Sequence, residues 1–110
     1  MSCLALSACA GIDYSKAPPV GWPELDIVVI AQNLKEVQVT CRNDFLPKVQ
    51  IRACAQANFS SGICRIFTSN PDNIDLMEHE KAHCRGYDHP YESSIRDGFQ
   101  SYQNMIRRIR

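Results

Sequence analysis

The chain has 110 residues, a length that allows one domain, and its 45% hydrophobic and 22% charged content argues against general disorder. Twelve basic and twelve acidic side chains give a formal net charge of zero. Because phosphate backbones are bound by a clustered positive excess, we expect no nucleic-acid partner.

The first ten residues are small and apolar, and they are too few to cross a bilayer as a helix. Within them, residues 6–9 (LSAC) resemble the lipobox of bacterial lipoproteins, in which the cysteine is lipidated. The resemblance implies a signal segment over residues 1–9 and a lipid on Cys9 as the membrane contact. Since Ala10 follows rather than aspartate, it also implies an outer-membrane lipoprotein facing the periplasm. If Cys9 is not lipidated, we expect a secreted protein.

Residues 10–23 contain Pro18, Pro19 and Pro23, which disfavour both helix and sheet. We interpret this segment as an extended tether. Trp22 is expected to close over the edge of the core, and residues 24–110 form the predicted folded domain.

Four strands are predicted in this domain. Residues 25–31 form a continuous apolar run, which fits a strand buried on both faces. Alternating patterns predict strands over 36–41 and 49–53, and a fourth strand over 63–68 follows a turn at 57–62.

Two helices are predicted after the strands. Asn70-Pro71-Asp72 is a helix-start signal for a helix over 71–85, and Gly86 is expected to end it in the left-handed conformation. Ser93 or Ser94 can cap a final helix whose apolar residues share one face: Ile95, Phe99, Tyr102, Ile106 and Ile109. The order predicts an α+β fold, with a four-stranded antiparallel or mixed sheet and both helices on one of its faces.

Residues 79–89 contain all three histidines of the chain, in the string H-E-x-x-H-x-x-G-x-x-H. On a helix, His79 and His83 lie on one face, and a reversal at Gly86 would bring back His89. Three protein ligands leave one position of a zinc ion for water, which is typical of a catalytic site. Glu80 can reach that water without binding the metal.

This string resembles the extended zinc motif of the metzincin clan, within the zincin metallopeptidases. The resemblance implies that His79, His83 and His89 bind Zn²⁺ and that Glu80 is the general base. It also implies a protein or peptide substrate.

The chain differs from that clan at several positions. Lys81 and Arg85 replace bulky apolar residues, and Met105 lies in a predicted helix rather than in a turn beneath the metal. We therefore interpret the domain as a minimal zincin, which we expect to be a monomer. Asp88 is an alternative third ligand.

The resemblance also implies where a substrate would bind. In zincins the strand before the active-site helix lines the cleft and pairs with extended substrate, and here that strand would be residues 63–68. Tyr87 or Tyr91 is a candidate for contacting the oxyanion or the substrate.

Four cysteines in the domain predict two disulfides and an oxidising compartment. The absence of a CxxC pair from the sequence argues against a zinc ribbon or an iron–sulfur site. Of the three possible pairings we favour Cys54–Cys64, across the predicted turn, which leaves Cys41–Cys84.

The sequence thus predicts a zinc metallopeptidase of the periplasm or cell envelope. An alternative is a non-enzymatic zinc-binding envelope lipoprotein with a structural or partner-binding role. A third possibility is a hydrolase of another bond, such as a peptide crosslink of the cell wall.

Overall fold

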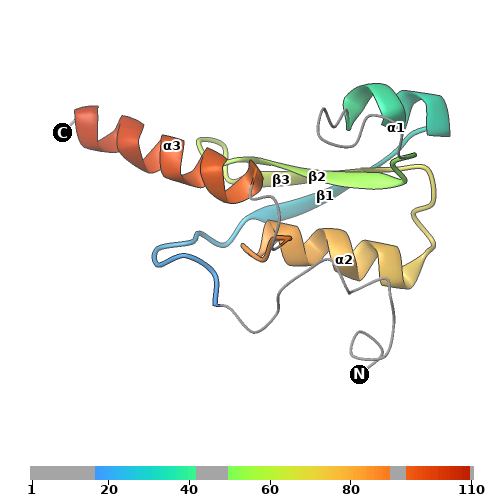
Figure 1. Ribbon diagram of the computed structural model, residues 1–110, viewed down its shortest axis with the longest axis horizontal. Coiled ribbons are helices and arrows are strands. Elements are labelled where there is room, and N and C mark those ends of the chain that lie inside the picture. The colour runs from blue at the N-terminus through green and yellow to red at the C-terminus, as the bar shows by residue number, and fades with distance from the viewer. Residues whose placement is uncertain (1–16, 42–49, 90–93, 110) are drawn as a thin grey trace.

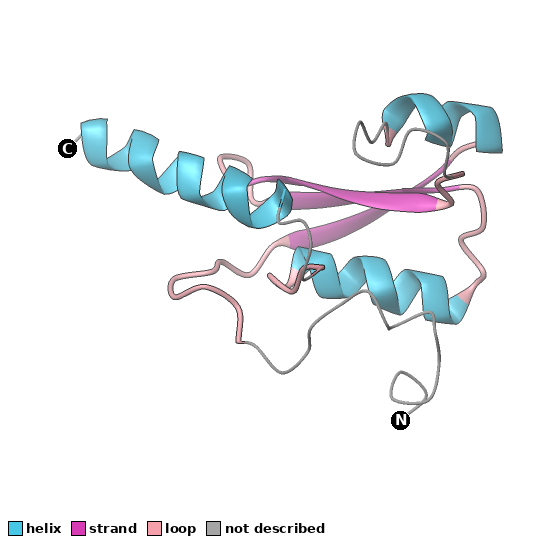
Figure 2. Cartoon of the chain, viewed as in Figure 1, coloured by secondary structure: helices cyan, strands magenta, loops and turns pink. Residues whose placement is uncertain are grey.

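The computed structural model describes residues 17–41, 50–89 and 94–109, and a sheet with helices on both faces lies at its centre (Figure 1). The elements are β1 (Asp26–Ala31), α1 (Leu34–Thr40), β2 (Ala53–Asn58), β3 (Ile63–Thr68), α2 (Ile74–Cys84) and α3 (Ser94–Ile109). Figure 2 distinguishes these helices and strands from the connecting loops. The predicted signal segment lies outside the described residues.

The sheet is mixed and has three strands in the order β1-β3-β2. Strand β1 runs parallel to β3, whereas β2 runs antiparallel to it. The predicted α+β class is confirmed. The predicted fourth strand is wrong for the described part of the chain. Helix α1 was not predicted, and it covers the face of the sheet opposite α2 (Figure 1).

Strand β1 lies where the apolar run predicts a strand, but it is not buried on both faces. Val28 and Val29 point to opposite faces, and they are 42% and 43% exposed. The reason is the position of β1 at one edge of the sheet, where it pairs with β3 alone among the described strands. An uninterrupted apolar run therefore marks an edge strand here.

Residues 36–41 belong to helix α1 and its C-terminal cap, so the strand predicted there is wrong. The Asn33 side chain accepts a hydrogen bond from the Glu36 N–H, and the Glu36 side chain accepts one from the Asn33 N–H. This reciprocal cap satisfies N–H groups at the helix start and favours helix over extended chain. An alternating strand would bury Val39 together with Val37, but Val39 is 76% exposed while Val37 is fully buried.

Strand β2 begins where the predicted strand over 49–53 ends. Its six residues pair with β3, from Ala53 opposite Thr68 to Asn58 opposite Ile63. The connection is a tight turn in which the Gly62 N–H donates to the Asn58 carbonyl, and Gly62 has a φ of +74°. The turn therefore starts later than predicted, and it fixes the register of the hairpin.

The disulfides join Cys41 to Cys54 and Cys64 to Cys84, so the predicted pairs Cys54–Cys64 and Cys41–Cys84 are wrong. Cys54 lies opposite Phe67, three residues beyond Cys64 on the same strand. Because side chains alternate along a strand, this odd offset turns the two cysteines to opposite faces of the sheet. Cys54 bonds to the end of α1, and Cys64 bonds to the end of α2.

Helix α3 presents its predicted apolar stripe to the core. Ile95 and Phe99 are buried, and Tyr102 and Ile106 are half-buried. The side chain of Ile109 lies outside what the structure describes. The start of α3 lies beside the sheet, and its C-terminal part projects away from it (Figure 1).

Candidate metal centre

Helix α2 starts at Ile74, later than the predicted Pro71, because Asn73 caps it. The Asn73 side chain accepts a hydrogen bond of 3.0 Å from the Leu76 N–H. The helix ends at Cys84, and Gly86 follows with a φ of +100°, a conformation that favours glycine. The predicted helix and its glycine stop are confirmed, apart from the first turn.

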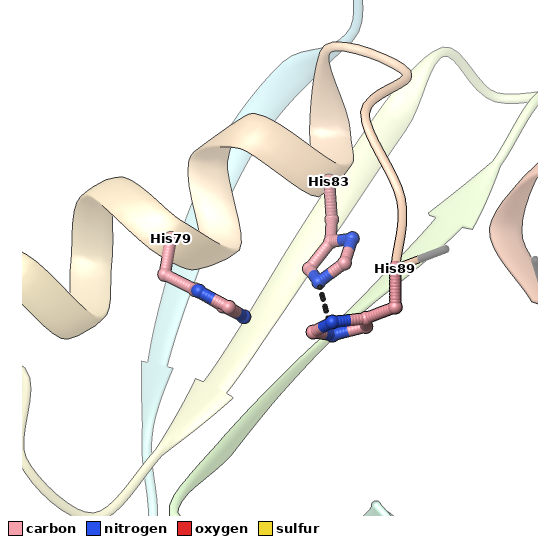
Figure 3. Close-up of side chains that lie close together, drawn as sticks. All are labelled: His79, His83 and His89. Atoms are coloured by element: carbon pink, nitrogen blue, oxygen red, sulfur yellow. Dashed lines mark hydrogen bonds between the residues drawn. The ribbon is translucent and has the colours of Figure 1, made fainter. Parts of the chain in front are cut away.

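The three histidines lie together, as the sequence predicts. His79 and His83 lie one turn apart on α2, and His89 returns from the turn that follows (Figure 3). Their ring centroids are 4.8 to 5.2 Å apart. One candidate ligand atom from each residue lies within 4.8 Å of the other two, so the group could hold a metal ion.

The ring of His83 is oriented by the backbone of the turn. Its Nδ1 lies 2.9 Å from the Tyr87 carbonyl, so we assign the ring proton to Nδ1, which donates to that oxygen. The lone pair of Nε2 then faces the cluster. A backbone carbonyl behind a histidine ligand is a common way to fix its tautomer and its orientation.

The distance between two of the rings fits a shared metal ion. Nε2 of His83 lies 3.2 Å from Nε2 of His89, as the dashed line in Figure 3 shows. Two nitrogens bound to one tetrahedral zinc ion at about 2.0–2.1 Å would lie about 3.4 Å apart. This pair therefore needs little movement to bind one ion, and a ligand atom of His79 lies within 4.8 Å of both.

Asp88 contacts two of the three histidines, the backbone of His89 and the ring of His83. Its side chain is buried, and its Oδ1 accepts a hydrogen bond of 2.9 Å from the His89 N–H. The same oxygen lies 3.8 Å from Nδ1 of His83. Since His89 itself joins the cluster, the structure gives no support to Asp88 as a replacement third ligand.

Burial sets the protonation of two groups on α2. Burial, with smaller effects from His79 and His89, lowers the pKa of His83 to about 4, against the opposing hydrogen bond to Tyr87. His83 is therefore neutral near pH 7, which is the form that binds metals. Burial also raises the pKa of Glu80, which is 5% exposed, to about 7. A cation nearby would favour the carboxylate and reverse part of that shift.

The other predicted site residues have mixed outcomes. Tyr87 is half-buried and contacts His83 through its carbonyl, while Tyr91 and Cys9 lie outside the described residues. Strand β3, residues 63–68, cannot be the edge that pairs with a substrate, because it is the central strand. That prediction is wrong, and the described sheet has its edges at β1 and β2.

Two side chains that hold the turn were not predicted as part of the site. Arg96 of α3 donates from Nε to the Gly86 carbonyl over 2.8 Å, and Trp22 donates from Nε1 to the Cys84 carbonyl over 3.0 Å. Both acceptors are backbone carbonyls, and no residue pattern reveals such contacts. The sequence placed Trp22 at the edge of the core, where it does pack.

Comparisons with protein-family models, with curated proteins and with solved structures find no match to this chain. The arrangement of its own residues therefore carries the functional argument. The two disulfides indicate an oxidising, extracellular compartment. Within the described ranges, no helix is long and apolar enough to span a membrane.

Proposed function

We propose that this protein is a zinc-dependent metallopeptidase. His79, His83 and His89 bind the ion, and Glu80 is the general base. The observation that carries the proposal is the convergence of the three imidazoles within 4.8 Å, in the order and spacing of a zincin motif. The donor set also fits, because neutral imidazoles are common zinc ligands and three of them leave a position for water.

Bound zinc would supply a Lewis acid for the scissile carbonyl and a water molecule of lowered pKa. Glu80 accepts the proton of the attacking water and delivers it to the leaving nitrogen. Burial raises the pKa of Glu80 to about 7 without metal, and a bound cation would favour the carboxylate form that accepts a proton. The Tyr87 carbonyl keeps His83 in the tautomer that the metal requires.

Strand β2 is the better candidate for pairing with an extended peptide. It is an edge strand, and it lies against the same helix that carries the histidines. Beside it, a shallow groove of about 230 Å³ is lined by Ala55, Ala57 and Phe59, and by Ile95 and Gly98 of α3. An extended substrate that adds to β2 could place an apolar side chain there.

The decisive experiment compares Glu80→Gln with wild type. The variant should keep zinc, measured by elemental analysis after dialysis, and should lose hydrolysis of a peptide library read by mass spectrometry. Glu78→Gln on the same helix is the matched control, because the Glu78 side chain is 52% exposed and should not matter. Cleavage by Glu80→Gln at the wild-type rate would refute the assignment. Crosslinked cell-wall peptides in the library test whether the protein instead hydrolyses a peptide crosslink of the cell wall.

One observation favours a second function. Glu80 is only 5% exposed, which would suit a residue that supports a non-catalytic zinc site. In that case the metal would hold α2 to the following turn, and zinc would bind without any hydrolysis in the same assay. Loss of the fold on chelation would then be the main effect of metal removal.

We further propose that the chain is a periplasm-facing lipoprotein anchored through Cys9. The lipobox-like residues 6–9 and the oxidising compartment that the disulfides indicate support this. Metabolic labelling with a lipid precursor should mark wild type and not Cys9→Ser. Equal membrane binding of both forms would contradict the anchor.

A further inference from the structure

The turn that carries His89 is covered by a segment from the other end of the chain. A Cβ atom built on Gly86 would lie 2.7 Å from the Cβ of Pro18 and 2.9 Å from the ring of Trp22. Both side chains therefore pack directly on the glycine backbone. The indole N–H of Trp22 also donates to the Cys84 carbonyl at the end of α2.

Trp22 is itself held by two distant elements. Its ring lies 5.3 Å from that of Phe59, in the β2–β3 turn, and 4.8 Å from that of Phe99 on α3. Arg96 of α3 reaches the Gly86 carbonyl. The turn is thus bound to Trp22 and to Arg96, and α3 contacts both the turn and the indole.

The three histidines depend on this arrangement to different degrees. The spacing between His79 and His83 is fixed by the helix that carries both. His89 lies beyond the helix, so its distance from the other two depends on the path of the chain at Gly86. A displaced turn would therefore move His89 away while His79 and His83 keep their spacing.

We propose that Trp22 is a positioning residue for the metal centre, which holds the turn so that His89 reaches the ion. The inference rests on the proposed zinc site. It also means that residues 17–23, part of the segment interpreted as a tether, are coupled to metal affinity.

A double-mutant cycle in the full chain tests this inference. Zinc affinity is measured by competition with a chelating dye, and the coordination of Co²⁺ is followed by visible absorption. Trp22→Ala should weaken zinc binding by about 10- to 100-fold, the usual effect of losing an outer-shell partner. In a His89→Ala background the same substitution should cause no further loss, because the ligand that Trp22 positions is gone. The Co²⁺ spectrum of Trp22→Ala should resemble that of His89→Ala.

Two further variants separate positioning from general stability. Trp22→Phe keeps an aromatic ring but has no N–H for the Cys84 carbonyl, so it should weaken zinc binding less than Trp22→Ala does. Tyr102→Leu removes a ring that stacks on Phe59 at 5.8 Å, and it should lower the melting temperature without changing zinc affinity. If Trp22→Ala does not fold, the cycle is made with Trp22→Phe.

The outcomes are distinct. Absence of zinc binding by wild type would refute the proposed function, and the inference with it. If wild type binds zinc but the Trp22 substitution has the same effect with and without His89, Trp22 only stabilises the fold and the inference is wrong. If the Trp22 substitution weakens zinc binding only when His89 is present, the inference is supported.

Discussion

The two faces of the sheet each carry one helix that is bonded to a strand by a disulfide. On one face α1, with seven residues, is joined to β2, and on the other α2, with eleven residues, is joined to β3. The bridged cysteines are separated by 13 and 20 residues, so the closed loops are similar in size. However, Cys84 directly follows His83 on α2. The comparison indicates that one disulfide serves the fold alone, while the other also fixes the helix that carries two of the candidate metal ligands.

Removing each disulfide in turn should produce the largest effects. Replacing either pair by alanine is expected to lower the free energy of unfolding by about 3 kcal/mol from chain entropy alone. The loss should be larger for Cys64→Ala/Cys84→Ala, because these side chains are 0% and 2% exposed and leave space in the core. Only this pair should also weaken zinc binding. Urea unfolding in chelator and zinc titration measure the two quantities, and an equal loss of zinc affinity in both double variants would contradict the distinction.

Glu80 should make the stability of the metal-free protein depend on pH. Folding raises the pKa of Glu80 from 4.5 to about 7, so its contribution is full below pH 4.5 and is lost as the pH rises through 7. Glu80→Gln should therefore raise the free energy of unfolding at pH 8 by up to about 3 kcal/mol, and the difference should vanish near pH 4. Denaturant unfolding in chelator from pH 4 to 8 measures this, with exposed Glu78→Gln as the control. A difference that does not change with pH would argue against a titrating buried carboxyl.

Zinc binding should stabilise the protein only through the histidines on the α2 side of the sheet, and not through α1 or its disulfide. At a free zinc concentration 100 times the dissociation constant, the expected gain in the free energy of unfolding is about 2.7 kcal/mol. The gain should persist in Cys41→Ala/Cys54→Ala and should be much smaller in His79→Ala, His83→Ala and His89→Ala. Thermal unfolding with and without zinc measures it. If zinc stabilised the histidine variants as much as wild type, the metal would bind at another place.

The smallest expected effect comes from the cap of α1. Asn33→Ala removes the hydrogen bond to the Glu36 N–H and should lower the free energy of unfolding by about 1 kcal/mol. Zinc affinity should not change, since α1 lies on the face of the sheet opposite α2, which carries His79 and His83 (Figure 1). A weaker zinc site in this variant would show that the two faces are coupled.

Much of the candidate metal centre could be predicted from the sequence because its geometry is local. Two histidines four residues apart must share a face of any helix that contains both, and a glycine after the helix permits the reversal to the third. Eleven consecutive residues therefore determine most of the site. The contacts from Trp22 and Arg96 were missed because they join backbone carbonyls to side chains far away in the sequence.

The sheet was predicted less well because strand pairing and cysteine pairing are long-range properties. The favoured pair Cys54–Cys64 assumed a turn centred on Phe59 with both cysteines on one face, but the register offsets them by an odd number of residues. In residues 36–41 the pattern fits either a strand or a helix, and the reciprocal cap between Asn33 and Glu36 decided for helix. The position of β3 at the centre depends on a parallel partner that no local pattern identifies.

The bond at Cys84 has a consequence for how the protein matures. Before Cys64 and Cys84 are oxidised, α2 has no covalent bond to β3, and its position on the sheet depends on packing and hydrogen bonds alone. Oxidation would then fix the helix that carries two of the three candidate ligands. The candidate site would therefore reach its full affinity for zinc only in the oxidising compartment that the disulfides indicate.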